Sequence, residues 1–174
     1  MDEELNKRFE KEFERVKKEL GFRPSLEELE RIFFFSDYIQ KEGYVSRNLS
    51  RMLSSRIVST YGMWEGYLHS LLMPSPSNMP NIEESKMMEE ADRKEILRCM
   101  TRIRAFVTKN AAIGLSEDRK AEAEFYNESV ELWDKELKAY LTRLMKKVNE
   151  GWLKNLKELD TKGPKQKNKD MNYF

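Results

Sequence analysis

Hydrophobic residues recur at intervals of three and four along most of the chain, which is the spacing of amphipathic helices. Over residues 3–20 a single narrow apolar stripe is surrounded by charged positions, so we expect a helix on the outside of the fold. The stripe consists of Leu5, Phe9, Phe13, Val16 and Leu20. No segment alternates between apolar and polar residues as a strand would. The pattern therefore predicts an all-α fold.

A second helix is predicted over residues 26–39. Ser25 and Glu28 have the spacing of a capping box, in which each side chain bonds a free backbone N–H of the other residue. Three consecutive phenylalanines, residues 33–35, would cover most of the circumference of a continuous helix. We therefore expect this helix to be buried on more than one side.

Three further helices follow from the same pattern. The third is predicted over residues 46–72, where the prolines of PSPSNMP end it. The fourth is expected to be capped by Asn81 and to end at Gly114. The last pattern covers residues 116–159, and we expect it to kink or break at Gly151, or else to project into a neighbouring subunit. Together these elements predict a four-helix bundle with an additional N-terminal helix and a Pro-rich crossover link.

Length and charge limit the number of domains and the class of partner. We expect one helical-bundle domain over residues 1–160 and a flexible basic tail over residues 161–174. Lys and Arg number 32 and Asp and Glu number 31, so we expect neither nucleic acid nor a membrane as partner. The 36% charged fraction is typical of long solvated helices and fits a heat-adapted protein. The single cysteine, Cys99, and the charged first residues indicate a cytoplasmic protein.

The third predicted helix has two unlike faces. One face carries bulky apolar residues and is expected to join the core. The opposite face carries only small residues: Ser55, Ser59, Gly62, Gly66 and Ser70. Exposed helix faces elsewhere in this chain carry Glu and Lys, so we expect the small residues to be covered. We expect the covering element to be a helix, either of the same chain or of another subunit in a homodimer or homotrimer. Alternatively, the face borders a groove for a planar ligand.

Few residues suggest chemistry. His69 lies four residues after Glu65, so the two side chains can meet, with His69 either a surface residue or a catalytic base. A lone histidine does not supply the repeated Glu-x-x-His motif of a bundle metal site, so no metal is predicted. Arg98, Arg102 and Lys109 share one side of the fourth helix. They are expected either to pair with carboxylates of the same helix or to clamp a phosphate or carboxylate through Arg98 and Arg102.

The segment RNLSRMLSSRIVSTYGMWEGYLHSLLMPSPSNMPN, residues 47–81, resembles a small uncharacterised archaeal all-helical family. Members of that family are four-helix bundles similar in shape to cobalamin adenosyltransferases. The resemblance implies a self-associating bundle but not the transferase activity. Adenosyltransferases bind ATP through an N-terminal Thr- and Gly-rich loop, and this chain begins MDEELNKRFEKEF instead. Their arginine-rich helix is matched only by Arg98, Arg102 and Arg104.

Two functions of different classes remain compatible with the sequence. The favoured one is a non-enzymatic, self-associating structural or interaction protein that needs no cofactor. In it, the small-residue face and the long last helix make the subunit contacts. The alternative is an adenosyltransferase-like bundle enzyme that binds a nucleotide or cofactor, ATP or cobalamin, at an arginine anion site. Catalytic residues and a substrate are not identified, so enzymatic activity is left open.

Overall fold

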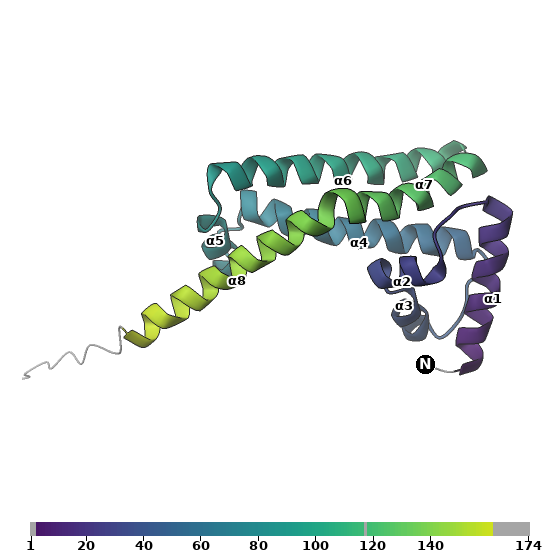
Figure 1. The fold of residues 1–174 in the computed structure, drawn as a ribbon, viewed down its shortest axis with the longest axis horizontal. Helices are drawn as coiled ribbons and strands as arrows, with labels where there is room; N and C mark the ends of the chain where they lie inside the picture. The colour runs from purple at the N-terminus through teal and green to yellow at the C-terminus, as the bar shows by residue number, and fades with distance from the viewer. Residues whose placement is uncertain (1–2, 117, 162–174) are drawn as a thin grey trace, which may run out of the picture.

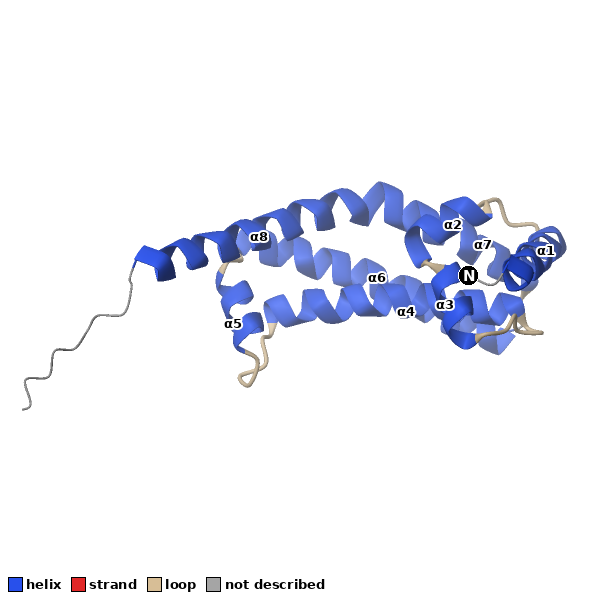
Figure 2. Cartoon of the chain, turned by 90° about the horizontal axis from the view of Figure 1, so that it is seen from below, coloured by secondary structure: helices blue, strands red, loops and turns tan. Residues whose placement is uncertain are grey.

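A computed structural model describes residues 3–116 and 118–161 (Figures 1 and 2). No strand occurs in these ranges, so the all-α prediction is confirmed. Residues 162–174, almost the whole predicted tail, lie outside the described residues. The elements in chain order are α1 (Glu3–Leu20), α2 (Leu26–Phe33), α3 (Phe35–Glu42), α4 (Leu49–Leu72), α5 (Met79–Lys86), α6 (Glu90–Ser116), α7 (Arg119–Glu131), the π-helical segment η1 (Leu132–Leu137) and α8 (Lys138–Thr161).

The long helices α4, α6 and α8 run lengthwise through the molecule, with α8 sloping away from the other two (Figure 1). α4 and α6 lie side by side along the long axis of the molecule and are joined through the short α5 (Figure 1). α7, η1 and α8 form a third long rod, and α1 crosses one end of the body. α2 and α3 lie between α1 and α4. The last turns of α8 extend beyond the other helices at the α5 end (Figures 1 and 2).

The second predicted helix is broken in the middle. Its start is as expected, because Ser25 and Glu28 form both bonds of a capping box. Phe34 then adopts a left-handed conformation with φ 53° and ψ 53°, which ends α2 and starts α3. Phe33 and Phe35 are fully buried, whereas Phe34 is 52% exposed. The expectation of one helix with three buried phenylalanines is therefore wrong, since the backbone turns at the middle phenylalanine.

We expect the Phe34→Asn variant to be more stable than the parent protein. The left-handed conformation costs a bulky residue about 1–2 kcal/mol, and asparagine adopts it more readily. Phe35→Asn is the matched control, because it places an amide where a fully buried ring packs, and it should lower the unfolding free energy by about 3 kcal/mol or more. Urea denaturation of both variants provides the measurement. A Phe34→Asn variant as unstable as Phe35→Asn would show that the half-exposed ring is itself a core contact.

Two other helix ends differ from the sequence-based expectations. The predicted fourth helix is two helices, α5 and α6, so the expectation of one helix is wrong. Asn78, not Asn81, caps the first of them, with its side-chain oxygen accepting a bond from the Asn81 N–H at 3.2 Å. α6 continues past Gly114 to Ser116. By contrast, Gly21 and Gly43 have the positive φ expected after a helix, 80° and 75°.

The irregularity in the last helical rod lies at η1 and not at Gly151. At η1 the Lys138 N–H bonds to the Trp133 carbonyl five residues back, which is the pattern of a π-helix. α8 is continuous through Gly151, so the expected kink or break there is wrong. Gly151 instead allows a close approach of α5, because a Cβ at this position would lie 2.3 Å from the Met87 sulfur.

A continuous series of aromatic contacts forms the half of the core nearest α1. Tyr61 on α4 lies at its centre, with ring centroids 5.0 Å from Phe106 on α6 and 5.8 Å from Phe33 on α2. Phe106 stacks on Phe125 of α7 at 4.4 Å. The Tyr61 hydroxyl donates to the Ser129 carbonyl, and burial raises the pKa of this hydroxyl above its usual value. The hydroxyl therefore stays protonated and ties α4 to α7.

Candidate functional site

The small-residue face of α4, formed by Ser55, Ser59, Gly62, Gly66 and Ser70, is not covered by another helix within residues 3–116 and 118–161. A Cβ built at Gly62 or Gly66 meets no atom within 4 Å. Ser55 and Ser59 are exposed, and only Ser70 is half-buried, its hydroxyl donating to the Tyr67 carbonyl. The expected close crossing inside the chain is therefore wrong. Coverage of this face by another molecule, either a second copy or a ligand, stays a prediction.

The open space at Gly62 allows a direct prediction. We expect Gly62→Ala to raise the unfolding free energy by about 0.5–1 kcal/mol, because alanine favours a helix and meets no neighbour here. Thermal unfolding at low protein concentration gives the measurement. Gly151→Ala is the control, since its Cβ would displace the Met87 side chain and offset the gain. A loss of stability in Gly62→Ala would mean that this face is packed against something in solution.

Glu65 and His69 do not act as a pair. Glu65 binds Arg104 of α6, with 2.7 Å between Oε1 and Nε, and its side chain is only 13% exposed. This bond joins α4 to α6 across the edge of the small-residue face. His69 lies exposed in the last turn of α4. Among the described residues, no three His, Cys, Asp or Glu side chains are grouped as a metal site would require.

Three cationic side chains of α6 lie next to carboxylates. Arg102 donates two bonds to Glu136, from Nε at 2.8 Å and from Nη2 at 2.5 Å, and it holds the pKa of that carboxyl below its usual value. Lys109 lies 2.5 Å from Glu128 of α7, and Arg98 lies 3.5 Å from Glu95 within α6.

A groove of about 280 Å³ beside Arg102 and Lys109 is also lined by three glutamates, Glu128, Glu131 and Glu136. Its lining therefore has more negative than positive charge. Of the two interpretations of these cations, pairing with carboxylates describes their contacts in the structure. The pairing of Arg102 and Lys109 is also between helices, whereas the sequence suggested pairs within the fourth helix.

Glu84 joins three helices and was not recognised from the sequence. Its carboxylate accepts a bond from the Tyr67 hydroxyl of α4 at 3.1 Å and from the Trp152 indole of α8 at 3.0 Å. Burial, together with the nearby Glu84 charge, raises the pKa of Tyr67. Glu84 lies on the short α5 behind the prolines, where no periodic pattern marks it. These bonds fix the position of α8 at the point where it leaves the body.

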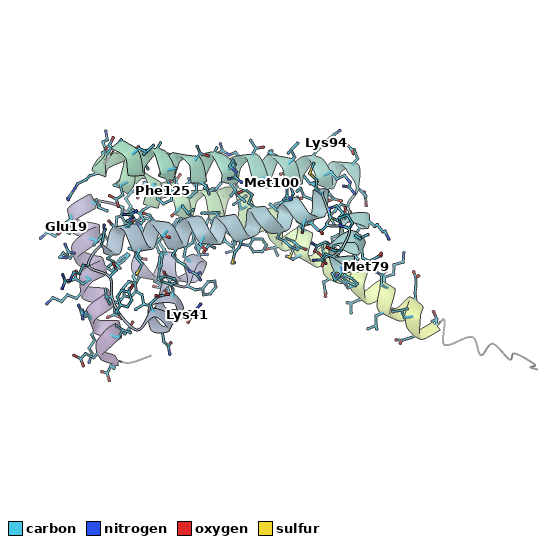
Figure 3. The ribbon with its side chains drawn as sticks, turned by 180° about the vertical axis from the view of Figure 1, so that it is seen from behind. Glu19, Lys41, Met79, Lys94, Met100 and Phe125 are labelled. Atoms are coloured by element: carbon cyan, nitrogen blue, oxygen red, sulfur yellow. The ribbon has the colours of Figure 1, made fainter. Side chains whose placement is uncertain are left out.

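The projecting end of α8 exposes apolar side chains. From residue 153 onward every described residue except Asn155 is exposed, and we call residues 153–161 the arm. Leu153, Leu156 and Leu159 on it are 50%, 55% and 71% exposed. Met79 lies at the end of the body from which the arm leaves (Figure 3) and is also exposed. The arm is the part of the described chain where unpartnered leucines recur at helical spacing.

Comparison with known protein families, with curated proteins and with solved structures gives no match for this chain. Within the described residues, no helix is long and apolar enough to cross a membrane.

Proposed function

We propose that the chain is a self-associating structural or interaction protein and that the arm is its principal contact with a second copy. The observation that carries this proposal is the exposure of Leu153, Leu156 and Leu159 on a helix end that no other part of the described chain covers. Exposed large apolar groups that recur on one element mark interaction surfaces. Burying a leucine contributes about 1.5–3 kcal/mol, so several of them supply a substantial driving force.

The charges of the arm favour a second copy over a strongly charged partner. Two lysines and two acids alternate with the leucines, namely Lys154, Lys157, Glu158 and Asp160. The arm is therefore neutral overall and can lie antiparallel against itself without repulsion. In a two-fold pairing centred at Leu156, Leu153 of each copy faces Leu159 of the other. Such a self-complementary contact is the usual way in which identical chains form a closed dimer.

Three further features support this proposal. The small-residue face of α4 is open, so a second helix can approach its backbone closely there. The architecture also supports a bundle interpretation, with α4, α6 and α7–α8 as its long helices. The broken pair α2–α3 takes the fourth place, α1 is the additional N-terminal helix, and α5 with its flanking prolines is the crossover link. Glu84 holds the base of the arm in a fixed direction.

The alternative function, an adenosyltransferase-like enzyme with an arginine anion site, gains no support at the residues that suggested it. Arg102 and Lys109 are bonded to glutamates, and their groove has an acidic excess. His69 is exposed, and among the described residues it forms no ion pair, while Glu65 is bonded to Arg104. The non-enzymatic function is therefore the one that we carry forward.

The full-length chain should sediment as a dimer or trimer at micromolar concentration and dissociate on dilution. Sedimentation velocity over a dilution series measures this, and chemical cross-linking followed by peptide mapping should place the cross-links at Lys154 and Lys157 of the arm. A monomer at every concentration would overturn the proposal. Cross-links between copies that avoid the arm altogether would overturn the assignment of the contact surface.

A further inference from the structure

A larger groove lies at the other end of the body from the arm. It has a volume of about 700 Å³ and is lined by the first turns of α4, the last turns of α6 and the start of α7. These helix ends lie together near α1 (Figure 1). We call it the basic groove, because Arg51 and Arg119 line it. Pockets for small organic ligands have volumes of roughly 300–1,000 Å³, so this groove is of suitable size.

The arginines of the basic groove differ from four arginines that bridge separate segments of the chain. Arg23, Arg31, Arg102 and Arg104 each bind a carboxylate of another element. Within the described residues, neither Arg51 nor Arg119 has such a partner.

An adjoining hollow of about 170 Å³ adds Arg47, which is likewise unpaired among the described residues. Glu122 is the acidic side chain that lines the basic groove together with Arg51 and Arg119. The lining therefore has an excess of positive charge that the other groove lacks. Two guanidinium groups with free N–H donors suit the geometry of a phosphate, which takes paired hydrogen bonds.

Side-chain caps at the starts of α4 and α7 bond some of the backbone N–H groups that could otherwise bind an anion. The Asn48 side chain accepts a bond from the Arg51 N–H at the start of α4. The Asp118 side chain accepts bonds from the Lys120 and Ala121 N–H groups at the start of α7. These caps bond part of the free N–H groups at the two helix starts, and the arginine side chains are the charged donors that remain for a ligand.

The rest of the basic groove can hold an uncharged group. Val58, Ala111 and Ile113 form an apolar wall. The Ser55 hydroxyl and the Asn110 amide also line the groove, and neither has a hydrogen-bond partner among the described residues. A bare phosphate would leave this wall and these polar groups without a contact. The volume and the lining therefore suit a phosphate that carries an organic part.

We propose that the basic groove binds a small organic phosphate. Arg51 and Arg119 bind the phosphate, and the organic part lies on Val58, Ala111 and Ile113, with Ser55 and Asn110 as hydrogen-bonding groups. This site is distinct from Arg98, Arg102 and Lys109. It is also independent of self-association through the arm, which lies at the opposite end of the body.

The test is calorimetric titration of the full-length protein with four probes: adenosine 5′-monophosphate, uridine 5′-monophosphate, glucose 6-phosphate and phenyl phosphate. At least one probe should bind, more tightly than inorganic phosphate and much more tightly than its dephosphorylated form, and binding should weaken as salt is added. If none of the four binds at millimolar concentration, the proposal is overturned. If inorganic phosphate binds as tightly as the best ester, the assigned role of the apolar wall is overturned.

Substitutions of the two groove arginines test whether the probe binds in the basic groove. Arg51→Gln and Arg119→Gln should each weaken binding of the best probe about tenfold, since each removes a charged hydrogen-bond donor, and the double variant should not bind detectably. Arg102→Gln is the matched control, because Arg102 has a glutamate partner and lies outside the basic groove. It should bind as the parent protein does. Arg51→Gln and Arg119→Gln variants that bind with parental affinity and melt normally would overturn the proposal.

Discussion

Replacing Leu156 and Leu159 together by glutamate is expected to abolish self-association without unfolding the chain. Both side chains are more than half exposed in the single chain, so their loss removes little of its own packing. In a dimer four leucines would be lost and like charges brought together. At about 1.5–3 kcal/mol for each buried leucine, association should weaken by at least about a thousandfold. Sedimentation velocity measures the change in mass, and circular dichroism confirms that the helices are retained.

Leu97→Glu is the matched control for this experiment. Leu97 is 58% exposed, a value close to that of Leu156, but it lies on α6 within the body. The control should keep the mass of the parent protein. If the double arm variant also keeps that mass, the arm is not the contact surface, and the small-residue face of α4 becomes the next one to test, by Gly62→Leu.

Replacing Tyr61 by alanine is expected to lower the unfolding free energy by about 3–5 kcal/mol, the usual cost of deleting a buried aromatic ring. Tyr61 is fully buried and contacts rings from α2 and α6, while its hydroxyl bonds to α7. Tyr61→Phe keeps the ring contacts but removes the hydroxyl bond to the Ser129 carbonyl, which keeps the Leu132 N–H as a donor. The cost should be about 0.5–1.5 kcal/mol, the net contribution of one hydrogen bond. Urea denaturation of both variants separates the contribution of the ring from that of the hydroxyl.

Tyr44→Ala provides the surface control, because Tyr44 is 57% exposed. It should change the unfolding free energy by less than about 0.5 kcal/mol. A neutral Tyr61→Phe variant would contradict the bond to Ser129. An equally small effect of Tyr61→Ala would contradict the central place of this residue in the aromatic core.

Helices whose ends have a local signal were predictable from the sequence. α1 has the predicted bounds, because its stripe, charged flanks and following Gly21 all agree. The start of α2 was predictable from the reciprocal bonding of Ser25 and Glu28. In both places the side chains that decide the structure lie within a few positions of each other. Periodicity and capping chemistry report such contacts directly.

The irregular points of the fold carry no such signal. Phe34 adopts a conformation that a phenylalanine disfavours, and the burial of the rings on either side of it is what maintains that conformation. The π-helical segment η1 likewise occurs in an unremarkable helical pattern. Gly151 is a residue that could break a helix, but here it serves the approach of Met87. Each of these features is decided by tertiary packing between distant segments.

The candidate sites were predictable to a smaller extent than the fold. The stripe of α6 cations was visible, but the carboxylates that neutralise Arg102 and Lys109 come from η1 and α7. The small-residue face was identified correctly as unlike the other helix faces, and its expected covering within the chain is absent among the described residues. Arg51 and Arg119 lie far apart in the sequence. Only the folded chain brings them to one groove.

The π-helical segment η1 has a consequence for the direction in which the arm presents its leucines. With about one additional residue per turn, η1 rotates less per residue than an α-helix, so every side chain downstream is turned about the helix axis relative to an uninterrupted α-helix. Converting η1 to ordinary α-helix without changing its length would turn all of α8 by about 100°, the rotation of one residue. The side chains of Leu156 and Leu159 would then face a different direction, and two copies would associate in a different orientation. The geometry of any assembly is thus encoded at a site remote from the surface that makes it.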